Sequence, residues 1–189
     1  MTVIRIDDIS VNTNYDKLKS IINFFTKLDS NISFLLGVSP LVFDMSNSKD
    51  KSKERIYPKI LNAHSDFRDF YKVNQMGIPD YISELRHTPN ISLASHSLIH
   101  VDHRLLTPSV QEVLILVSCS LINSQIFIPP FNKFDSATVD ICVRNNIELI
   151  KFEDGWKHLL YNKFEIDSVS KYYFHTHDID LGFLEDLFL

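Results

Sequence analysis

The sequence is poor in glycine and has no concentration of basic charge, and these shortages exclude several classes of protein. Only four glycines and seven prolines occur among 189 residues, which argues against a fibrous or disordered chain. The formal net charge is −5. Because binding to phosphates requires clustered lysine and arginine, neither nucleic acid nor an anionic membrane surface is an expected partner.

Long apolar runs and paired cysteines are also lacking. The richest apolar stretch, residues 110–122, is interrupted by polar side chains and is too short to form an integral membrane segment. Cys119 and Cys142 lie in apolar, helix-like stretches without the Cys-x-x-Cys spacing, which favours buried free thiols over a disulfide. No basic region followed by an apolar segment opens the sequence, so we expect no secretory signal and a cytoplasmic location.

The hydrophobic residues, 44% of the chain, are arranged in patterns that alternate between strand and helix. With this length we expect a single domain over residues 1–189. Strand-like runs occur at 3–6, 32–38, 91–95, 125–128, 147–152 and 171–174. Helix-like patterns begin after residues 12–14 and cover 79–87, 107–122, 135–145 and 181–189, while the charged segment 46–55 is expected to be a loop. This alternation predicts an α/β fold with a mostly parallel sheet or barrel.

Polar side chains follow several of the predicted strands at the point where each strand ends. Asp7 and Asp8 close the first strand, and His96, Asp154 and His175 follow three later ones. Functional residues of parallel α/β folds gather beyond the carboxyl ends of the strands. We therefore expect these side chains to lie together at the carboxyl ends of the strands, at one mouth of the sheet or barrel.

The pair His96 and His100 has a spacing that lets both imidazoles face one metal ion. A catalytic zinc typically takes three protein ligands and keeps one position open, and one carboxylate of Asp7-Asp8 would complete that set. Two adjacent carboxylates repel each other unless their roles differ, so one could bind the metal while the other acts as general base. The alternative is that His96 and His100 are a loop cap and an exposed residue, beside a solvated Asp-Asp turn.

The order of these motifs resembles that of the polysaccharide deacetylases, the NodB-homology group of carbohydrate esterase family four (CE4). The matching segments are Ile6-Asp7-Asp8, His96-Ser97-Leu98-Ile99-His100, Ile128-Pro129-Pro130-Phe131, Asp154-Gly155-Trp156 and Tyr173-Phe174-His175. The resemblance covers about Val3 to His177. The resemblance implies a distorted (β/α) barrel of about seven mostly parallel strands.

Roles for individual residues follow from the same resemblance. Asp7 would be the general base, and His175 would be the general acid that protonates the leaving amine. The metal would be held by Asp8, His96 and His100, and Zn²⁺ is the expected ion, with Co²⁺, Ni²⁺ or Fe²⁺ as alternatives. A backbone N–H in the region of Pro130 and Phe131 would face the oxyanion, and Trp156 would line the pocket.

The sequence departs from the family pattern in three places. The arginine expected in the third motif, where it orients the base, is replaced by Ile128. Arg5, which lies two residues before Asp7 on the same strand face, could take its place, and Arg104 is a second candidate. Ile9 stands where a glycine usually follows the paired aspartates, and His177 is an alternative to His175 as the acid.

These observations predict a metal-dependent hydrolase that removes an acetyl group from an N-acetylated sugar. The favoured substrate is an intermediate of surface-polysaccharide biosynthesis. The principal alternative, which Ile128 favours, is a catalytically weakened or inactive homologue that binds a sugar. A third interpretation is an α/β domain in which the motifs are accidental. The sequence favours no particular oligomeric state.

Overall fold

The computed structural model describes residues 2–10, 13–40, 80–162, 164–165, 170–179, 182 and 184. The loop predicted at 46–55 lies outside these residues, and so does most of the helix predicted at 181–189. None of the helices within the described ranges is long and apolar enough to cross a membrane.

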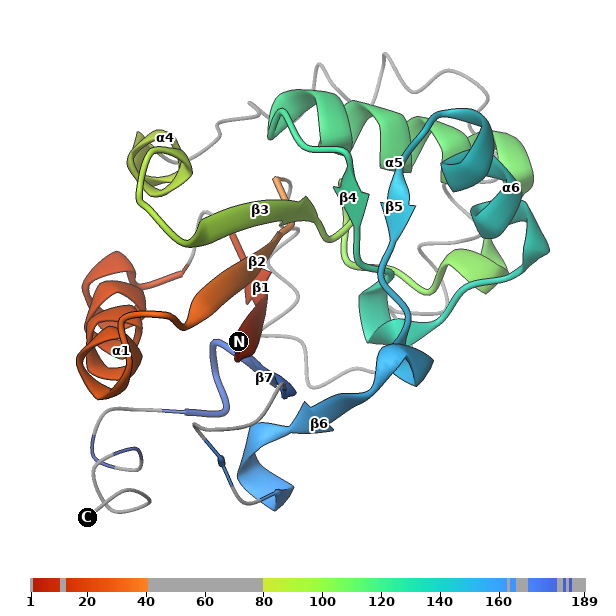
Figure 1. Ribbon diagram of the computed structural model, residues 1–189. Helices are drawn as coiled ribbons and strands as arrows, with labels where there is room; N and C mark the ends of the chain where they lie inside the picture. Colours follow the sequence, from red (N-terminus) through yellow and green to blue (C-terminus); the bar gives the residue numbers. More distant parts are fainter. Residues whose placement is uncertain are drawn as a thin grey trace, which may run out of the picture.

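Seven parallel strands form one sheet that curls into a half-barrel (Figure 1). The strands are Val3–Ile9 (β1), Ser33–Val38 (β2), Ile91–Ser95 (β3), Ile126–Phe127 (β4), Glu148–Leu149 (β5), Trp156–His158 (β6) and Lys171–His175 (β7). Their order across the sheet is β5-β4-β3-β2-β1-β7-β6, and every adjacent pair is parallel. The predicted α/β architecture of about seven mostly parallel strands is confirmed, with β5 and β6 as edges.

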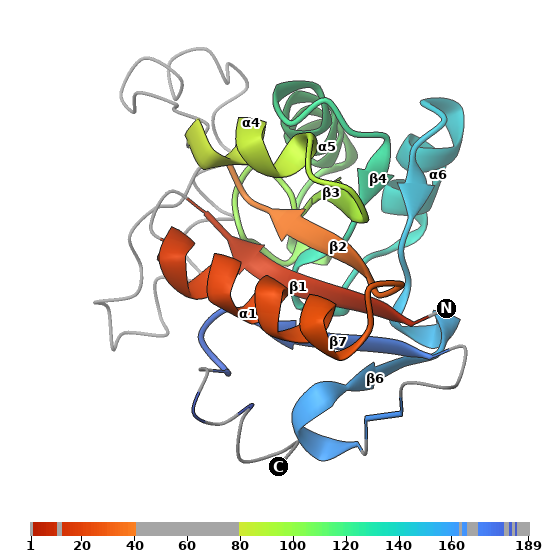
Figure 2. The ribbon, with the colours of Figure 1, turned by 60° about the vertical axis from the view of Figure 1, so that its left-hand side comes forward.

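Helices cover the outer face of the curled sheet. They are Tyr15–Leu28 (α1), Asp80–Arg86 (α4), Pro108–Leu121 (α5) and Ser136–Arg144 (α6), with 3₁₀ turns at His103–Leu105, Pro130–Asn132, Phe152–Asp154 and Leu159–Tyr161. Figure 2 shows α1 lying across β1 and β2, whereas α5 and α6 lie beside β3, β4 and β5. Helix α1 begins where the sequence predicts, and α4, α5 and α6 begin and end within one residue of their predicted bounds.

Strand β1 separates two apolar clusters because its side chains alternate between the faces of the sheet. Ile4 and Ile6 belong to the outer cluster, together with the buried face of α1. Val3 packs with the inner cluster, which contains Leu35, Ala94, Ile128, Ile150 and Trp156. Arg5 and Asp7 share the face of Val3, so two charged side chains point into the hollow of the sheet. Their burial requires compensating partners.

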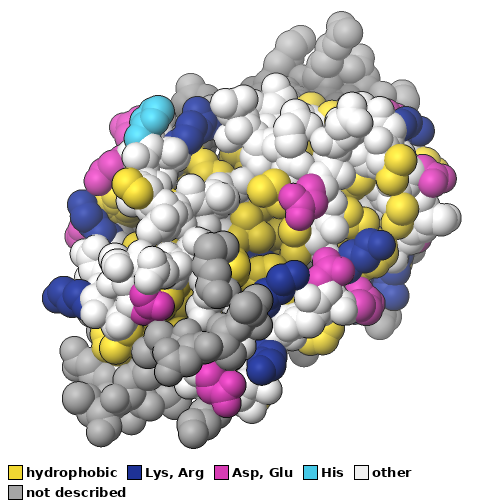
Figure 3. Space-filling model, in the orientation of Figure 1, with side chains coloured by type: hydrophobic (Ala, Val, Ile, Leu, Met, Phe, Trp, Pro, Cys, Tyr) yellow, Lys and Arg dark blue, Asp and Glu magenta, His cyan; other side chains and the backbone are white. Residues whose placement is uncertain are grey.

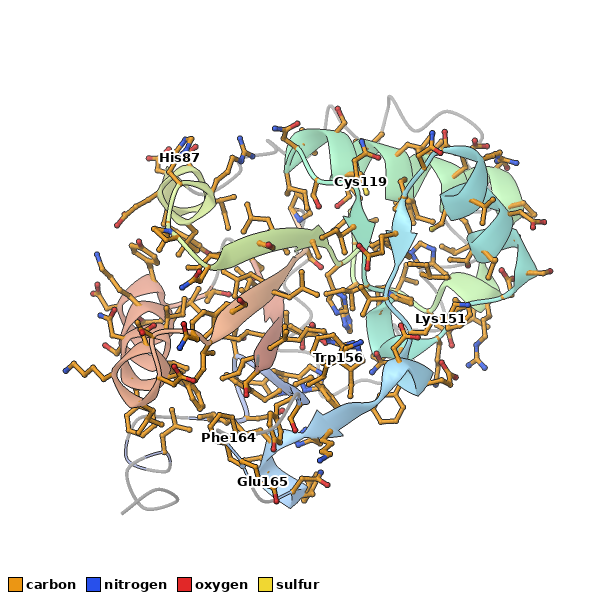
Figure 4. The ribbon with its side chains drawn as sticks, in the orientation of Figure 1. His87, Cys119, Lys151, Trp156, Phe164 and Glu165 are labelled. Carbon is orange, nitrogen blue, oxygen red and sulfur yellow. The ribbon has the colours of Figure 1, made fainter. Side chains whose placement is uncertain are left out.

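One face of the molecule shows hydrophobic side chains gathered across its centre (Figure 3). The histidine visible on this face lies over α4, where Figure 4 labels His87. His87 is therefore an exposed histidine in the turn that follows α4.

The N-termini of α1 and α6 are capped by polar side chains. Asn14 accepts a hydrogen bond from the backbone N–H of Lys17. Asp135 accepts one from the backbone N–H of Thr138 at 3.0 Å, and the Thr138 hydroxyl completes a capping box. Such caps satisfy backbone donors that have no partner within the helix.

We expect the substitution Asp135→Ala to lower the free energy of unfolding by about 1 kcal/mol, because the capping box is lost. Asp140→Ala, at an exposed position of the same helix, is the matched control and should change it by less than about 0.5 kcal/mol. Urea unfolding monitored by circular dichroism measures both values. Equal effects of the two substitutions would contradict the role given to the cap.

Candidate metal centre

The end of β1 directs two neighbouring carboxylates to different partners. Asp8 has a positive φ of 63°, and the pairing of β1 with β2 shifts register between Ile6 and Ile9. Asp7 is 1% exposed and stays inside the half-barrel, whereas Asp8 faces the loop that follows β3. The left-handed turn therefore gives each carboxylate its own surroundings, although the two residues are adjacent.

Asp7 forms a buried ion pair with Arg5. The Nε and Nη2 atoms of Arg5 lie 3.1 and 2.8 Å from Asp7 Oδ2, and Nη2 also donates to Asn132 Oδ1 at 2.8 Å. The guanidinium lies 5.1 Å from the ring centroid of Trp156 and 5.0 Å from that of Tyr173. Hydrogen bonds and aromatic faces thus compensate the buried positive charge.

Arg5 is therefore the arginine that reaches Asp7, as one of the two sequence alternatives proposed. The other candidate, Arg104, forms its hydrogen bonds with Asp102 at 3.1 and 2.8 Å. Ile128 occupies the place of the family arginine and packs inside the half-barrel, fully buried.

Asp8, His96 and His100 converge in the way that the sequence predicts. Asp8 Oδ1 lies 3.3 Å from His96 Nε2 and 3.1 Å from His100 Nε2. Two ligands bound at 2.0–2.1 Å to one tetrahedral ion lie about 3.4 Å apart, so both distances suit a shared ion. Asp8 Oδ1 is buried and receives no well-formed hydrogen bond from the described residues. This unsatisfied oxygen is consistent with a cation ligand.

The tautomer of His96 also suits a metal ligand. Its Nδ1 lies 2.9 Å from the backbone carbonyl of Ile128, which can accept a proton only from an Nδ1–H. The lone pair of Nε2 is then available on the side that faces Asp8. A carbonyl partner behind the imidazole is the usual arrangement for a histidine that binds metal.

The charges around this cluster favour a cation. Burial raises the pKa of Asp8, but the imidazoles of His100 and His96 outweigh burial and hold that pKa well below its usual range. Burial lowers the pKa of His96, yet the carboxylates of Asp8 and Asp7 and the Ile128 carbonyl raise it overall. Positive charge is therefore stabilised at this point, and the donor set fits a divalent metal ion.

Backbone strain is concentrated around the same residues. Asp8, Ser97, Phe131 and Asn132 all have φ between 54° and 66°, a region that costs free energy for residues other than glycine. The Phe131 ring packs against His100 with centroids 4.3 Å apart. Such strain is typical of functional sites that the surrounding structure holds in place.

His175 is held by Asp178, a residue that the sequence analysis did not identify. The Nδ1 and the backbone N of His175 lie 2.8 and 3.1 Å from Asp178 Oδ2. Burial raises the pKa of Asp178, but the bonds from His175 lower it overall. His158 also lies near Asp178, at 3.6 Å, and its side chain is 15% exposed.

His177 is more exposed than His175. Its side chain is 70% exposed, its Nδ1 lies 3.8 Å from Asp8 Oδ2, and its Nε2 lies 3.4 Å from Asp178 Oδ1. Asp154, which we expected at the same mouth, does not join this group. It is exposed and accepts a hydrogen bond from the backbone N–H of Lys151.

The remaining predicted site residues lie on both sides of the Arg5–Asp7 pair. Pro130 is buried in the turn that carries Phe131, and Phe131 is 45% exposed. Trp156 is 6% exposed and lies in the hollow of the sheet beside Arg5 (Figure 4). Trp156 therefore contacts Arg5, the ion-pair partner of the predicted base Asp7.

Comparisons with known proteins support the fold. No protein-family model and no curated protein matches the sequence. Among solved structures, the wild-type form of a CE4 family pseudoenzyme from Bacillus anthracis matches with a TM-score of 0.51 and 15% identity. A mutant of that pseudoenzyme, described as having restored enzymatic activity, matches with a TM-score of 0.52 and 16% identity.

Each match covers 99% of this chain, and 60% and 62% of the other chains respectively. The chain therefore spans about 60% of the length of the structures that it resembles. The predicted NodB-like (β/α) architecture is confirmed at the level of the fold.

Gly37 on β2 leaves the space that Asp7 occupies. A Cβ at this position would lie 2.9 Å from Asp7 Oδ1 and 3.3 Å from Ile128 Cδ1. We expect Gly37→Ala to lower the free energy of unfolding by about 1–3 kcal/mol through overpacking, measured by urea unfolding. Ser92→Ala, at an exposed position of the neighbouring strand, is the control. If Gly37→Ala proves as stable as wild type, Asp7 does not need this space.

His103 should make stability depend on pH. Burial lowers its pKa to about 3, and its Nε2 pairs with the Ser97 hydroxyl at 2.9 Å. The unfolded imidazole takes up a proton near pH 6.5, whereas the folded one stays neutral. The contribution of His103 is therefore complete above about pH 6.5 and is lost progressively as pH falls toward 3.

The measurement compares wild type with His103→Gln at pH 7.5, 6.0 and 5.0, by chemical unfolding of metal-free protein. We expect the stability advantage of wild type to shrink at each step toward lower pH. His87→Gln, which replaces an exposed histidine, is the control. A difference that stays constant across this range would contradict the prediction.

Proposed function

We propose that the chain is a metal-dependent hydrolase that removes the acetyl group from an N-acetylated sugar. An intermediate of surface-polysaccharide biosynthesis is the substrate class that we favour. The observation that carries the proposal is the Arg5–Asp7 ion pair beside the Asp8, His96 and His100 cluster. A base with an arginine partner therefore accompanies a metal-binding set, even though Ile128 replaces the arginine of the family motif.

The metal would be held by Asp8, His96 and His100, and Zn²⁺ suits two imidazoles and a carboxylate. When bound, such an ion polarises the amide carbonyl and lowers the pKa of water to about 7. His96 is oriented by the bond between its Nδ1 and the Ile128 carbonyl, so that Nε2 is the nitrogen it would contribute to this set.

Asp7 would act as the general base through one particular oxygen. Its Oδ2 accepts both hydrogen bonds from Arg5, whereas Oδ1 is buried and receives none from the described residues. Oδ1 is therefore the oxygen that can take the proton of the attacking water. Arg5 fixes the orientation of the carboxylate, and Trp156 and Tyr173 fix the plane of Arg5.

His175 would protonate the leaving amine. Its Nδ1 faces Asp178, so the proton that it transfers must leave from Nε2. Asp178 fixes the orientation of the ring, as a carboxylate behind an imidazole commonly does. We prefer His175 to His177 because His177 is 70% exposed and has the longer contact with Asp178, 3.4 Å.

The turn at Pro130–Asn132 would stabilise the oxyanion. The backbone of Phe131 is strained, with φ of 58°, its ring packs against His100, and its N–H donates to none of the described residues. One such donor commonly contributes about 3 kcal/mol to stabilisation of the transition state. We also propose a reducing, cytoplasmic setting, for which the buried free thiols of Cys119 and Cys142 are the support.

A second candidate function is sugar binding without catalysis. The solved structures that this chain resembles are described as pseudoenzymes, and Ile128 departs from the motif of active members. In this alternative, the same cluster and the aromatic side chains bind a sugar, with or without the metal.

Acetate release from N-acetylglucosamine oligomers, with one equivalent of Zn²⁺, tests the two candidates. We expect measurable release by wild type and a loss of about 10²–10⁴-fold in Asp7→Asn, since the general base is removed. Zinc content should be unchanged in Asp7→Asn because Asp7 is not a ligand. Asp140→Asn, which removes one negative charge at an exposed position of α6, is the control.

Three outcomes separate the interpretations. Release that depends on Asp7 and on zinc supports the hydrolase. Binding of the oligomers, measured by calorimetry, without release by any form supports the second candidate. Wild-type protein that has been supplied with one equivalent of Zn²⁺ and then dialysed should retain the zinc. Protein that retains none would contradict the proposed metal centre.

A further inference from the structure

We propose that the chain binds a second divalent metal ion between Asp8, His175 and His177, and that this ion inhibits hydrolysis. The inhibition would arise because the second ion occupies the histidine needed as the general acid. The assignment of the first metal site and of the acid rests on the proposed function, whereas the second site rests on the contacts described below.

Asp8 has one oxygen for each of two ions. Its Oδ1 faces His96 and His100 at 3.3 and 3.1 Å, while its Oδ2 faces His177 Nδ1 at 3.8 Å. One ligand atom each from Asp8, His175 and His177 lies within 4.8 Å of the others. The Asp8 carboxylate can therefore bridge two ions, as carboxylates do in two-metal sites.

Asp178 prepares His175 as a ligand and lies near His177. Its Oδ2 is bonded to His175 Nδ1 at 2.8 Å, and its Oδ1 faces His177 Nε2 at 3.4 Å. A carboxylate that takes one N–H of an imidazole leaves the lone pair of the other nitrogen available for a metal, which here is Nε2 of His175. In His177 the nitrogen that faces Asp8 is Nδ1, and the two rings stack with an interplanar angle of 19°.

A neighbouring group of side chains is also close enough to bind an ion but is less suited to do so. His158, His175 and Asp178 are also close enough to surround an ion. However, His158 Nδ1 accepts a hydrogen bond from the backbone N–H of Leu160, so its Nε2 carries the proton and faces Asp178 as a donor. In that group His158 therefore presents an N–H and not a lone pair, which favours the set that includes His177.

The second ion should bind more weakly than the first. The 3.8 Å between Asp8 Oδ2 and His177 Nδ1 exceeds the spacing of about 3.4 Å expected around a tetrahedral ion, and His177 is 70% exposed. A small movement of an exposed side chain must therefore accompany binding. Once bound to Nε2 of His175, the ion blocks the atom that would otherwise carry the proton to the leaving amine.

Zinc titration in competition with a chromophoric chelator tests the number of sites. We expect wild type to bind two ions in distinct steps. His177→Ala should keep the first step and weaken the second by about tenfold or more. His96→Ala should lose the tight step instead, and His87→Ala, at an exposed histidine just after α4, should bind as wild type does (Figure 4).

Cobalt provides a readout that needs no variant. We expect the electron paramagnetic resonance signal of the first Co²⁺ to lose intensity as the second binds, because the Asp8 carboxylate couples the two ions.

In the hydrolysis assay, the rate of wild type should rise up to one equivalent of Zn²⁺ and fall beyond it. The fall should disappear in His177→Ala.

A single binding step in wild type, or a second step that His177→Ala leaves unchanged, would overturn the proposal. Two coupled ions without hydrolysis at any zinc concentration would instead reject the proposed function and leave the second metal site intact. Hydrolysis with a single ion and no inhibition by excess zinc would reject the second site alone.

Discussion

The structure at the carboxyl ends of the central strands depends on keeping two adjacent negative charges apart. Asp7 and Asp8 follow each other on one strand, and both carboxylates are largely withdrawn from solvent. The left-handed φ of Asp8 turns the second carboxylate away, and each then has its own positive or metal-binding partners. Arg5 compensates Asp7 inside the half-barrel, while imidazoles surround Asp8 at the rim. Without this division, neither charge could stay buried at an acceptable free-energy cost.

Much of this arrangement could be predicted from periodicity and from the order of motifs. The helices and six of the strands follow from the apolar patterns, because each of these elements buries one regular face or run. The convergence of Asp8, His96 and His100 follows from the rule that parallel strands end at one edge. Strand β6 was missed because Trp156–His158 is only three residues long and shows no alternation.

The supporting residues of the site could not be read from the sequence. Asp178 lies only three residues after His175, but an aspartate in a loop carries no signal of its own. His158 has no partner nearby in the chain, since its neighbour Asp178 comes from the end of another strand. Ile128 could be recognised as a departure from the motif, yet its carbonyl bond to His96 depends on the three-dimensional fold alone. Local sequence therefore identifies the atoms of the site better than the contacts that orient them.

The position of the buried guanidinium has a consequence for which substitutions the site can tolerate. The guanidinium comes from β1, and the side chain of Ile128 lies beside Gly37 in the same hollow. Two guanidinium groups in one hollow would repel each other, and none would leave Asp7 uncompensated. The arginine could thus be moved to another strand only by paired substitutions. A buried charge therefore couples positions that lie far apart in the sequence.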